Sequence, residues 1–220
     1  MTGSNAGPAG TLAAGHARRY ALRMDDAPRT LATYADILAL PSEDRAEVLH
    51  GRLSTLPGAL PKHSRVQRSL SRYIGGPFDD DDGAGGPGGW WILIETDVRF
   101  GPYMITRPDV VGWRRSRLEA PWDMRPIDVV PDWICEVTSP SNGRRDRVEK
   151  SRIYLAAGVP HYWLIDPEER TLEAYSVHEG YWLQVGVYEE TSVARIAPFE
   201  AIELPVGRLF PPRPSAPAEP

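Results

Sequence analysis

The spacing of apolar side chains changes along this chain of 220 residues, and the changes mark out helices and strands. From Ser64, apolar residues recur at i, i+4, i+7 and i+8, which is one face of a helix. These residues are Val66, Leu70, Tyr73 and Ile74. We expect the GGP segment at residues 75–77 to end this helix. Residues 90–100 (WWILIETDVRF) then alternate between apolar and polar side chains, with Glu95 and Asp97 on the polar face, and predict one half-exposed strand.

Other elements follow from local signals. Thr33 and Asp36 resemble a capping box, which predicts a short helix. Residues 46–56 (AEVLHGRLSTL) have apolar runs on both sides of a His-Gly turn and predict a hairpin. A further helix is expected over residues 146–157, closed by Gly158. The remaining strands are expected at residues 105–113, 133–137, 161–166, 171–177 and 181–188.

This order of elements indicates one mixed α/β (α+β) domain, with a central mixed sheet and helices packed on it. We expect the domain to span residues 30–210. Residues 1–29 lack periodicity and predict a flexible N-terminal tail, and residues 211–220 predict a proline-rich C-terminal tail.

Composition and charge restrict the classes of function. No stretch approaches the roughly 18 apolar residues of a membrane span, and the N-terminus lacks the apolar region of a secretory signal. Cys135 is the single cysteine, which excludes an internal disulfide framework and predicts a buried structural thiol in a reducing cytoplasm. A net charge of -5 argues against tight, non-specific binding of nucleic acid except through a local basic patch.

The segment PDWICEVTSPS (131–141) places a carboxylate inside a predicted buried strand. Ile134 and Glu136 share one face of that strand, and Cys135 and Val137 share the other. Burial of an ionised carboxylate costs several kcal/mol unless it is paired, hydrogen-bonded or bound to metal. A structural salt bridge is the simplest explanation of Glu136.

Other polar residues near Glu136 favour a catalytic explanation. Asp109 also lies in a predicted strand, and Asp146, Lys150 and Tyr154 recur along one side of the next helix. Lys150 is one of only two lysines among 25 basic residues. Two strand carboxylates with a lysine nearby suit metal-assisted phosphodiester hydrolysis, because Mg²⁺ prefers carboxylate oxygens and water.

Three segments in this order carry a family resemblance: RPDVVGW, PDWICEVTSPS and DRVEKSRIYLAAGVPHYWLIDP. Together they resemble the Uma-two family of bacterial endonucleases, a branch of the PD-(D/E)XK nuclease superfamily. The resemblance covers roughly residues 30–210. It implies a restriction-endonuclease-like core, dependence on Mg²⁺ or Mn²⁺, DNA as substrate and a homodimer. It also implies that Asp109 and Glu136 bind the metal.

One position departs from the superfamily pattern, and two upstream segments add candidates. The superfamily lysine would stand two residues after Glu136, where this chain has Thr138; the resemblance implies that Lys150 takes its place. AEVLHGRL and PKHSRVQRSL resemble the family's glutamate hairpin and histidine-led helix, so Glu47 is a further catalytic candidate. Glu47 also fits the surface of a hairpin.

Several polar residues have both a functional and a simpler explanation. His63 would touch phosphate, or cap its helix or lie on the surface. Glu95 is either an extra metal ligand or a solvent-exposed residue of its strand. Basic residues on two helices would contact DNA phosphates if both helices border one cleft, or otherwise form solvated faces. The candidates for DNA contact are His63, Arg65, Arg144, Arg145 and Arg147.

The sequence therefore predicts a Mg²⁺-dependent DNA endonuclease with Asp109, Glu136, Lys150 and Glu47 in its active site. Two alternatives stay open. One is a nuclease-like domain that binds DNA or a protein partner without cleavage, and the other is an unrelated structural protein in which Glu136 is salt-bridged.

Overall fold

The computed structural model describes residue 1 and residues 30–79, 85–139 and 145–213. The chain divides after Thr30, and the fold described below is that of the unit from Leu31 onward. Residues 2–29 of the predicted N-terminal tail lie outside the described residues, as does the predicted C-terminal tail from residue 214.

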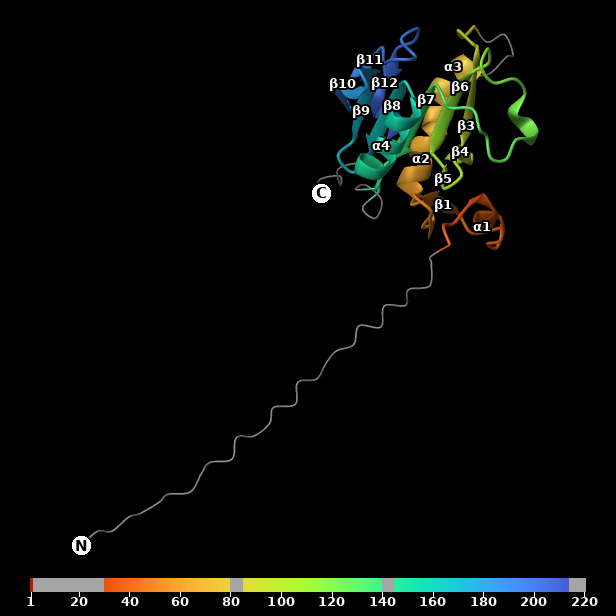
Figure 1. The fold of residues 1–220 in the computed structure, drawn as a ribbon. Helices are drawn as coiled ribbons and strands as arrows, with labels where there is room; N and C mark the ends of the chain where they lie inside the picture. The colour runs from red at the N-terminus through yellow and green to blue at the C-terminus, as the bar shows by residue number, and fades with distance from the viewer. Residues whose placement is uncertain (2–29, 80–84, 140–144, 214–220) are drawn as a thin grey trace. The chain divides into compact units, whose positions relative to one another are not determined.

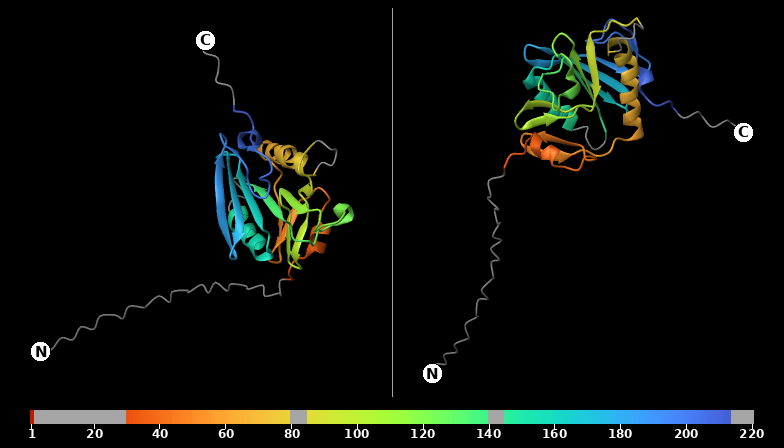
Figure 2. Two further views of the ribbon diagram at one scale, coloured as in Figure 1. Left: turned by 90° about the horizontal axis from the view of Figure 1, so that it is seen from above. Right: turned by 90° about the vertical axis from the view of Figure 1, so that its right-hand side faces the viewer.

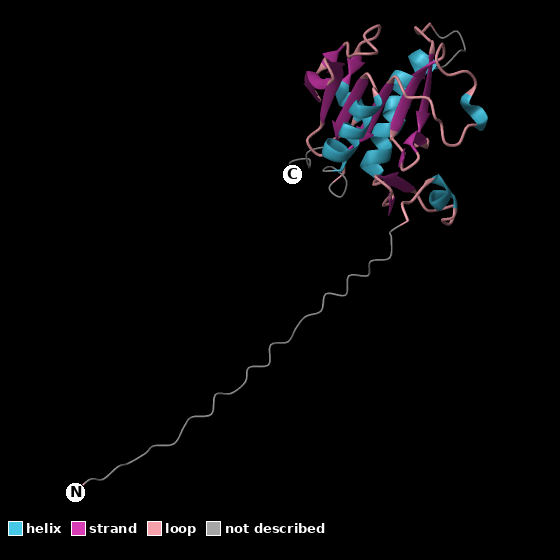
Figure 3. Ribbon diagram, in the orientation of Figure 1, coloured by secondary structure: helices cyan, strands magenta, loops and turns pink. Residues whose placement is uncertain are grey.

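A six-stranded mixed sheet forms the centre of this unit, with the strand order β10-β9-β8-β7-β6-β3 (Figures 1 and 3). The middle strands β7 and β8 are parallel, and every other neighbouring pair in this sheet is antiparallel. The strands are β3 (Trp90–Ile94), β6 (Val110–Arg114), β7 (Trp133–Val137), β8 (His161–Asp166), β9 (Thr171–His178) and β10 (Tyr181–Glu189). The mixed α/β class predicted from the sequence is confirmed.

A second, four-stranded antiparallel sheet has the order β2-β1-β5-β4. Its strands are β1 (Ala46–Leu49), β2 (Arg52–Thr55), β4 (Val98–Gly101) and β5 (Met104–Thr106). The predicted hairpin over 46–56 is β1 and β2, with His50 and Gly51 at positive φ in its turn. Two short strands, β11 (Val193–Ala194) and β12 (Leu204–Pro205), pair separately.

Helices cover both faces of the six-stranded sheet (Figure 2). Cys135 and Val137 pack with Val66 and Leu70 of α2, whereas Ile134 packs on the other face with residues of α4. This separation is the alternation expected of a strand buried on both faces. The helical elements are α1 (Tyr34–Leu38), α2 (Pro61–Leu70), η1 (Ser71–Gly75), α3 (Gly76–Asp79), η2 (Pro121–Asp123), η3 (Arg145–Lys150), α4 (Ser151–Ala157) and η4 (Val206–Leu209).

The helix that begins at Pro61 runs past its predicted end. The prediction that residues 75–77 stop it is wrong, because η1 widens into a π-helical turn and α3 continues to Asp79. Pro77 has no N–H for the helical hydrogen bonds, and it stands directly after this wider turn, in which the Gly76 N–H donates to the carbonyl of Ser71. Burial of Phe78 against Phe199, with ring centroids 4.7 Å apart, favours the continuation.

The predicted single strand over 90–100 is also wrong. Glu95 has φ 49°, a left-handed conformation that interrupts the alternation, so β3 and β4 lie in different sheets. Asp97 is consequently buried rather than on an exposed polar face. The expected strand at 105–113 is likewise divided into β5 and β6. The short helix at Thr33 and the three later strands are confirmed.

Among the residues that the structure describes, no helix is long and apolar enough to cross a membrane. The single cysteine, Cys135, is buried with a free thiol, as predicted.

Candidate functional site

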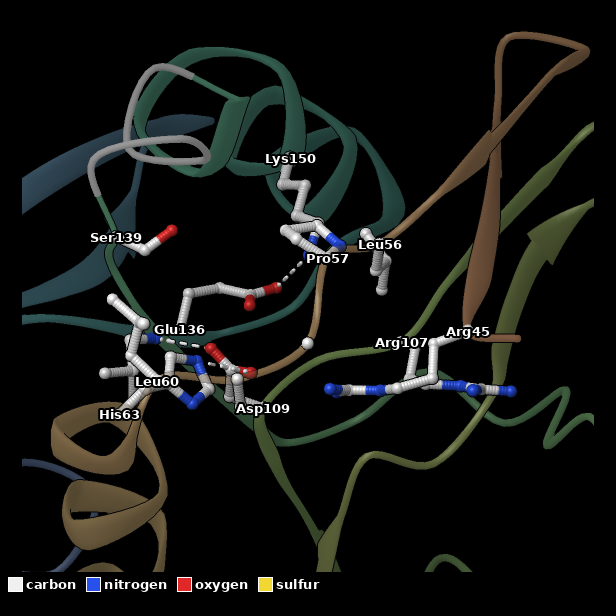
Figure 4. A pocket seen from close by; sticks show the side chains of 13 residues that line it. Arg45, Leu56, Pro57, Leu60, His63, Arg107, Asp109, Glu136, Ser139 and Lys150 are labelled. Atoms are coloured by element: carbon white, nitrogen blue, oxygen red, sulfur yellow. Dashed lines mark hydrogen bonds and ion pairs between the residues drawn. The ribbon is translucent and has the colours of Figure 1, made fainter. Parts of the chain in front are cut away.

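The polar residues singled out in the sequence meet where β6 and β7 lie side by side. Asp109 immediately precedes β6, and Glu136 is the next-to-last residue of β7. The antiparallel register pairs Val110 with Cys135, so Asp109, just before Val110, and Glu136, just after Cys135, stand at the same end of the two strands. Both carboxylates line one pocket of about 250 Å³ (Figure 4).

Asp109 is held by hydrogen bonds to both of its carboxylate oxygens. The backbone N–H of Val137 donates to Oδ2 at 2.7 Å. His63 Nε2 lies 3.1 Å from Oδ1, and Gln67 Nε2 donates to the same oxygen at 3.3 Å. His63 and Gln67 are one turn apart on α2, so this helix orients the Asp109 side chain against the end of β7.

Glu136 is bound by two residues of the helix that follows β7. Lys150 Nζ donates to Glu136 Oε1 at 3.0 Å, and the Tyr154 hydroxyl donates to the same oxygen at 2.5 Å. Lys150 and Tyr154 are one helical turn apart, which puts both on the side that faces the sheet. Burial, and then the charge of Glu136, raises the pKa of Tyr154 well above its usual value. Tyr154 is therefore a neutral hydrogen-bond donor.

Lys150 joins Glu136 to a third carboxylate. Its Nζ lies 2.8 Å from Oε1 of Glu47, and the backbone N–H of Arg107 donates to the same Glu47 oxygen at 2.9 Å. Glu47 is fully buried and Lys150 is 4% exposed. The hairpin β1–β2, the strand β7 and the helix η3–α4 are thus connected through one ammonium group.

The charges that the described residues bring to this cluster do not cancel. Among these residues, three carboxylates (Glu47, Asp109 and Glu136) and one ammonium group sum to a formal charge of −2 when His63 is neutral. Burial lowers the pKa of His63, but the hydrogen bond and the charge of Asp109 outweigh burial, so its pKa is raised above the usual value. Excess negative charge in a partly enclosed pocket attracts cations.

The donor atoms suit a hard divalent cation, since carboxylate oxygens are the ligands that Mg²⁺ and Mn²⁺ prefer. Among the described residues, no group of three or more His, Cys, Asp or Glu side chains is arranged to hold a metal ion. Mg²⁺ commonly binds through one or two carboxylates and completes its coordination with water and substrate phosphate. Asp109 and Glu136 are the residues that fit this mode.

Three candidates occupy different environments from those that the simpler explanations predict. Glu47 is not a surface residue of its hairpin, because β1 lies between β2 and β5. His63 is neither a cap nor exposed; it is 9% exposed and bonded to Asp109. Glu95 lies in the break after β3, where it binds Arg45 at 2.6 Å and Gln67 at 3.1 Å.

The proposed DNA-contacting arginines lie away from this pocket where they are described. Arg65 is exposed on α2 and is not among the residues that line the pocket. Arg147 binds Glu173 and lines a separate small cavity beside Tyr175. Arg144 lies outside the described residues, and the side chain of Arg145 does as well. Their contact with DNA stays a prediction.

Four residues at the site received no assigned role from the sequence: Gln67, Tyr154, Arg45 and Arg107. Gln67 and Tyr154 each stand four residues after an identified candidate on a helix, a spacing that points to one shared face. No sequence signal points to Arg45 or Arg107, because both are brought to the pocket by the second sheet.

A family model described as "Putative restriction endonuclease", Uma2, matches residues 31–207. The chain belongs to the Uma2 family. This is the Uma-two family indicated by the sequence motifs, and its match includes Glu47, Asp109, Glu136 and Lys150. Family and fold together indicate a restriction-endonuclease-like nuclease.

A solved structure has a similar fold to this Uma2 member. It is the crystal structure of a "putative nuclease belonging to DUF820" from Anabaena variabilis, with a TM-score of 0.65 and 23% sequence identity. The similarity covers 81% of this chain and 97% of that one. Among curated proteins, none matches the chain significantly.

Proposed function

We propose that this protein is a metal-dependent endonuclease that hydrolyses phosphodiester bonds of DNA. The observation that carries the proposal is the placement of Asp109, Glu136 and Lys150 around one pocket in a chain of the Uma2 family. In this function, Asp109 and Glu136 bind Mg²⁺ or Mn²⁺. The bound cation supplies an activated water and offsets charge on the phosphate.

The other residues of the pocket position groups around the scissile phosphate. The Lys150 ammonium, held between Glu47 and Glu136, donates hydrogen bonds to the attacking water or to the phosphate as negative charge develops there. Glu47 assists by holding Lys150 in place. His63 and Gln67 keep the Asp109 carboxylate facing the pocket.

Cleavage of supercoiled plasmid tests this function directly. The wild-type protein is expected to nick or linearise plasmid in Mg²⁺ or Mn²⁺ and to be inactive with EDTA. Glu136→Gln keeps the side-chain shape, removes the charge and is expected to abolish cleavage. Glu149→Gln is the matched control, since Glu149 precedes Lys150 but does not line the pocket. Wild-type inactivity with both metals would contradict the proposal.

The closed hydrogen-bond network favours a second candidate function, a domain that binds DNA or a protein without cleaving it. Asp109 and Glu136 already accept hydrogen bonds from the protein's own donors. A catalytically silent domain requires no metal to balance them. It would bind labelled DNA with equal affinity in Mg²⁺ and in EDTA and would leave plasmid intact.

We also propose that the protein acts in the cytoplasm as a homodimer. A reducing compartment suits the buried free thiol of Cys135.

The edge strand β10 exposes Tyr181 and Leu183, and an exposed apolar edge favours pairing with a second copy. The mass in solution, from light scattering, tests this; Leu183→Lys is expected to shift a dimer toward monomer, and a monomeric wild-type protein would contradict it.

A further inference from the structure

The pocket has a second polar end that none of the proposed catalytic groups occupies. Arg45 and Arg107 lie at this end, and the same pocket is lined elsewhere by Asp109, Glu136 and Lys150. Figure 4 shows the two arginine side chains side by side, across the pocket from Ser139. Arg45 precedes β1 and Arg107 follows β5. Because these strands are antiparallel neighbours, the two arginines lie at adjacent strand ends.

The two arginines at this end of the pocket are each paired with one carboxylate, and a third arginine adds positive charge from outside the pocket. Arg107 Nε lies 2.6 Å from Oδ1 of Asp97, and Nε of Arg125, which does not line the pocket, lies 3.3 Å from the other oxygen of the same carboxylate. One buried carboxylate shared by two guanidinium groups leaves one positive charge uncompensated beside the pocket. Arg45 is paired with Glu95, so it adds donors to this end without changing its charge.

Both guanidinium groups keep donors for a ligand. The Arg107 side chain donates through Nε to Asp97, and its two terminal nitrogens have no partner among the described residues. Arg45 binds Glu95 through one terminal nitrogen, which leaves the other terminal nitrogen as its donor for a ligand, since its Nε is buried. Planar guanidinium forks match phosphate oxygens.

We propose that Arg45 and Arg107 form a binding subsite for a backbone phosphate of the nucleic acid, next to the phosphate held at Asp109 and Glu136. The proposal rests on the proposed nuclease function and deepens it. The carboxylate end takes the cation, and the arginine end takes a phosphate of the same strand. The ligand is therefore a polynucleotide strand rather than a phosphomonoester or a free anion.

The same arginine connects the subsite to the catalytic cluster. The Arg107 backbone N–H donates to Glu47, which binds Lys150. A phosphate bound by the Arg107 side chain would hold this backbone segment in place, and thereby Glu47 and Lys150. Arg107 acts in this way as a positioning residue, whereas Arg45 contributes to strand binding alone.

Binding of a fluorescently labelled oligothymidylate in Ca²⁺, at several salt concentrations, tests the subsite without relying on cleavage. Arg45→Gln is expected to weaken binding about 10-fold, the scale of one charged hydrogen bond. The slope of log K against log salt is expected to fall by about 0.7 for one lost phosphate contact on a single strand. Loss of a structural ion pair alone would leave that slope unchanged.

Arg99→Gln is the matched control, because Arg99 also pairs with a carboxylate (Asp128) but does not line this pocket. Arg107→Gln should reproduce the Arg45→Gln result. If loss of the Asp97 pair unfolds this variant, as its melting temperature would show, Arg45→Gln carries the test. Equal affinities and slopes for wild type and Arg45→Gln, or an equal loss in Arg99→Gln, would overturn the subsite.

Two further outcomes distinguish the subsite from the nuclease function and from a free-anion site. If the wild type binds the oligonucleotide through Arg45 but never cleaves DNA, the subsite stands and the nuclease function fails. If the wild type cleaves DNA and the Arg45→Gln variant binds the oligonucleotide normally, the nuclease function stands and the subsite fails. Inorganic phosphate at millimolar concentration is expected not to displace the oligonucleotide, and full displacement would overturn a polynucleotide subsite.

Discussion

Nζ of Lys150 lies 3.0 Å from Oε1 of Glu136, although the two residues belong to a helix and a strand. In the superfamily pattern that the sequence resembles, a lysine would stand at position 138, but this chain has Thr138, whose backbone N–H donates to the carbonyl of Ile165 just beyond β7. The ammonium group of Lys150 instead reaches Glu136 from η3 and also binds Glu47. One ammonium group therefore lies between two buried carboxylates.

Glu136→Gln separates catalysis from structural pairing. The substitution removes one of two carboxylates that share Lys150 and leaves Lys150 paired with Glu47. We expect cleavage to be lost and the melting temperature to stay equal or rise. A purely structural salt bridge predicts a loss of roughly 3–5 kcal/mol on removal of one partner. Calorimetry of the variant without metal decides between these two results.

Asp109→Asn is expected to cost stability as well as activity. Both carboxylate oxygens of Asp109 accept hydrogen bonds from N–H donors. Asn replaces one of these oxygens by an NH₂ group, which cannot accept a hydrogen bond, so one buried donor loses its acceptor. A buried donor left without its acceptor costs about 1–3 kcal/mol. Chemical denaturation without metal should show a loss on this scale. An unchanged free energy of unfolding would mean that the hydrogen bonds from Val137 and His63 to Asp109 do not stabilise the fold.

Divalent cations should stabilise the folded protein if the carboxylate cluster binds them. A ligand at 100 times its Kd raises the free energy of unfolding by about 2.7 kcal/mol. We expect Mg²⁺ or Mn²⁺ to raise the melting temperature of the wild type, with little effect on Glu136→Gln. Glu149→Gln should respond like the wild type. A wild-type melting temperature that does not respond to either ion would count against metal binding at Asp109 and Glu136.

Lys150→Arg tests whether the ammonium group acts differently from a general cation. Arginine is a larger, rigid fork that cannot adopt the same geometry between Glu47 and Glu136. We expect DNA binding in Ca²⁺ to change little and turnover in Mg²⁺ to fall by roughly 10² or more. Arg152→Lys is the control, since Arg152 is exposed and does not line the pocket. Equal turnover for the two variants would mean that catalysis does not need the ammonium geometry of Lys150.

Cys135 should be chemically inert in the folded protein. Burial, followed by the charges of Asp109 and Glu136, raises the pKa of this thiol well above its usual value. Since the thiolate is the reactive form, a thiol reagent should label Cys135 only after unfolding, even at pH 9. Rapid labelling of the native protein would show that β7 opens frequently.

Local signals in the sequence were enough for the elements whose stability is local. The capping box at Thr33, the His-Gly turn of the hairpin and the apolar residues on both sides of Glu136 in β7 each depend on neighbouring residues, and the structure confirms all three elements. Alternation also correctly assigned Ile134 and Cys135 to opposite faces of the sheet. The spacing of Lys150 and Tyr154 likewise predicted one helix face, because helix geometry requires it.

Tertiary contacts decided the rest. Nothing local predicts that the chain turns at Glu95 through a positive φ, or that burial of Phe78 carries a helix through a proline. The burial of Glu47 and His63 depends on elements far apart in the chain: β5 packs beside β1, and α2 lies against the end of β7. The sequence therefore determined which residues could do chemistry. Only the packing of two sheets and two helices decided which of these residues share one pocket, because a shared pocket depends on contacts between segments far apart in the chain.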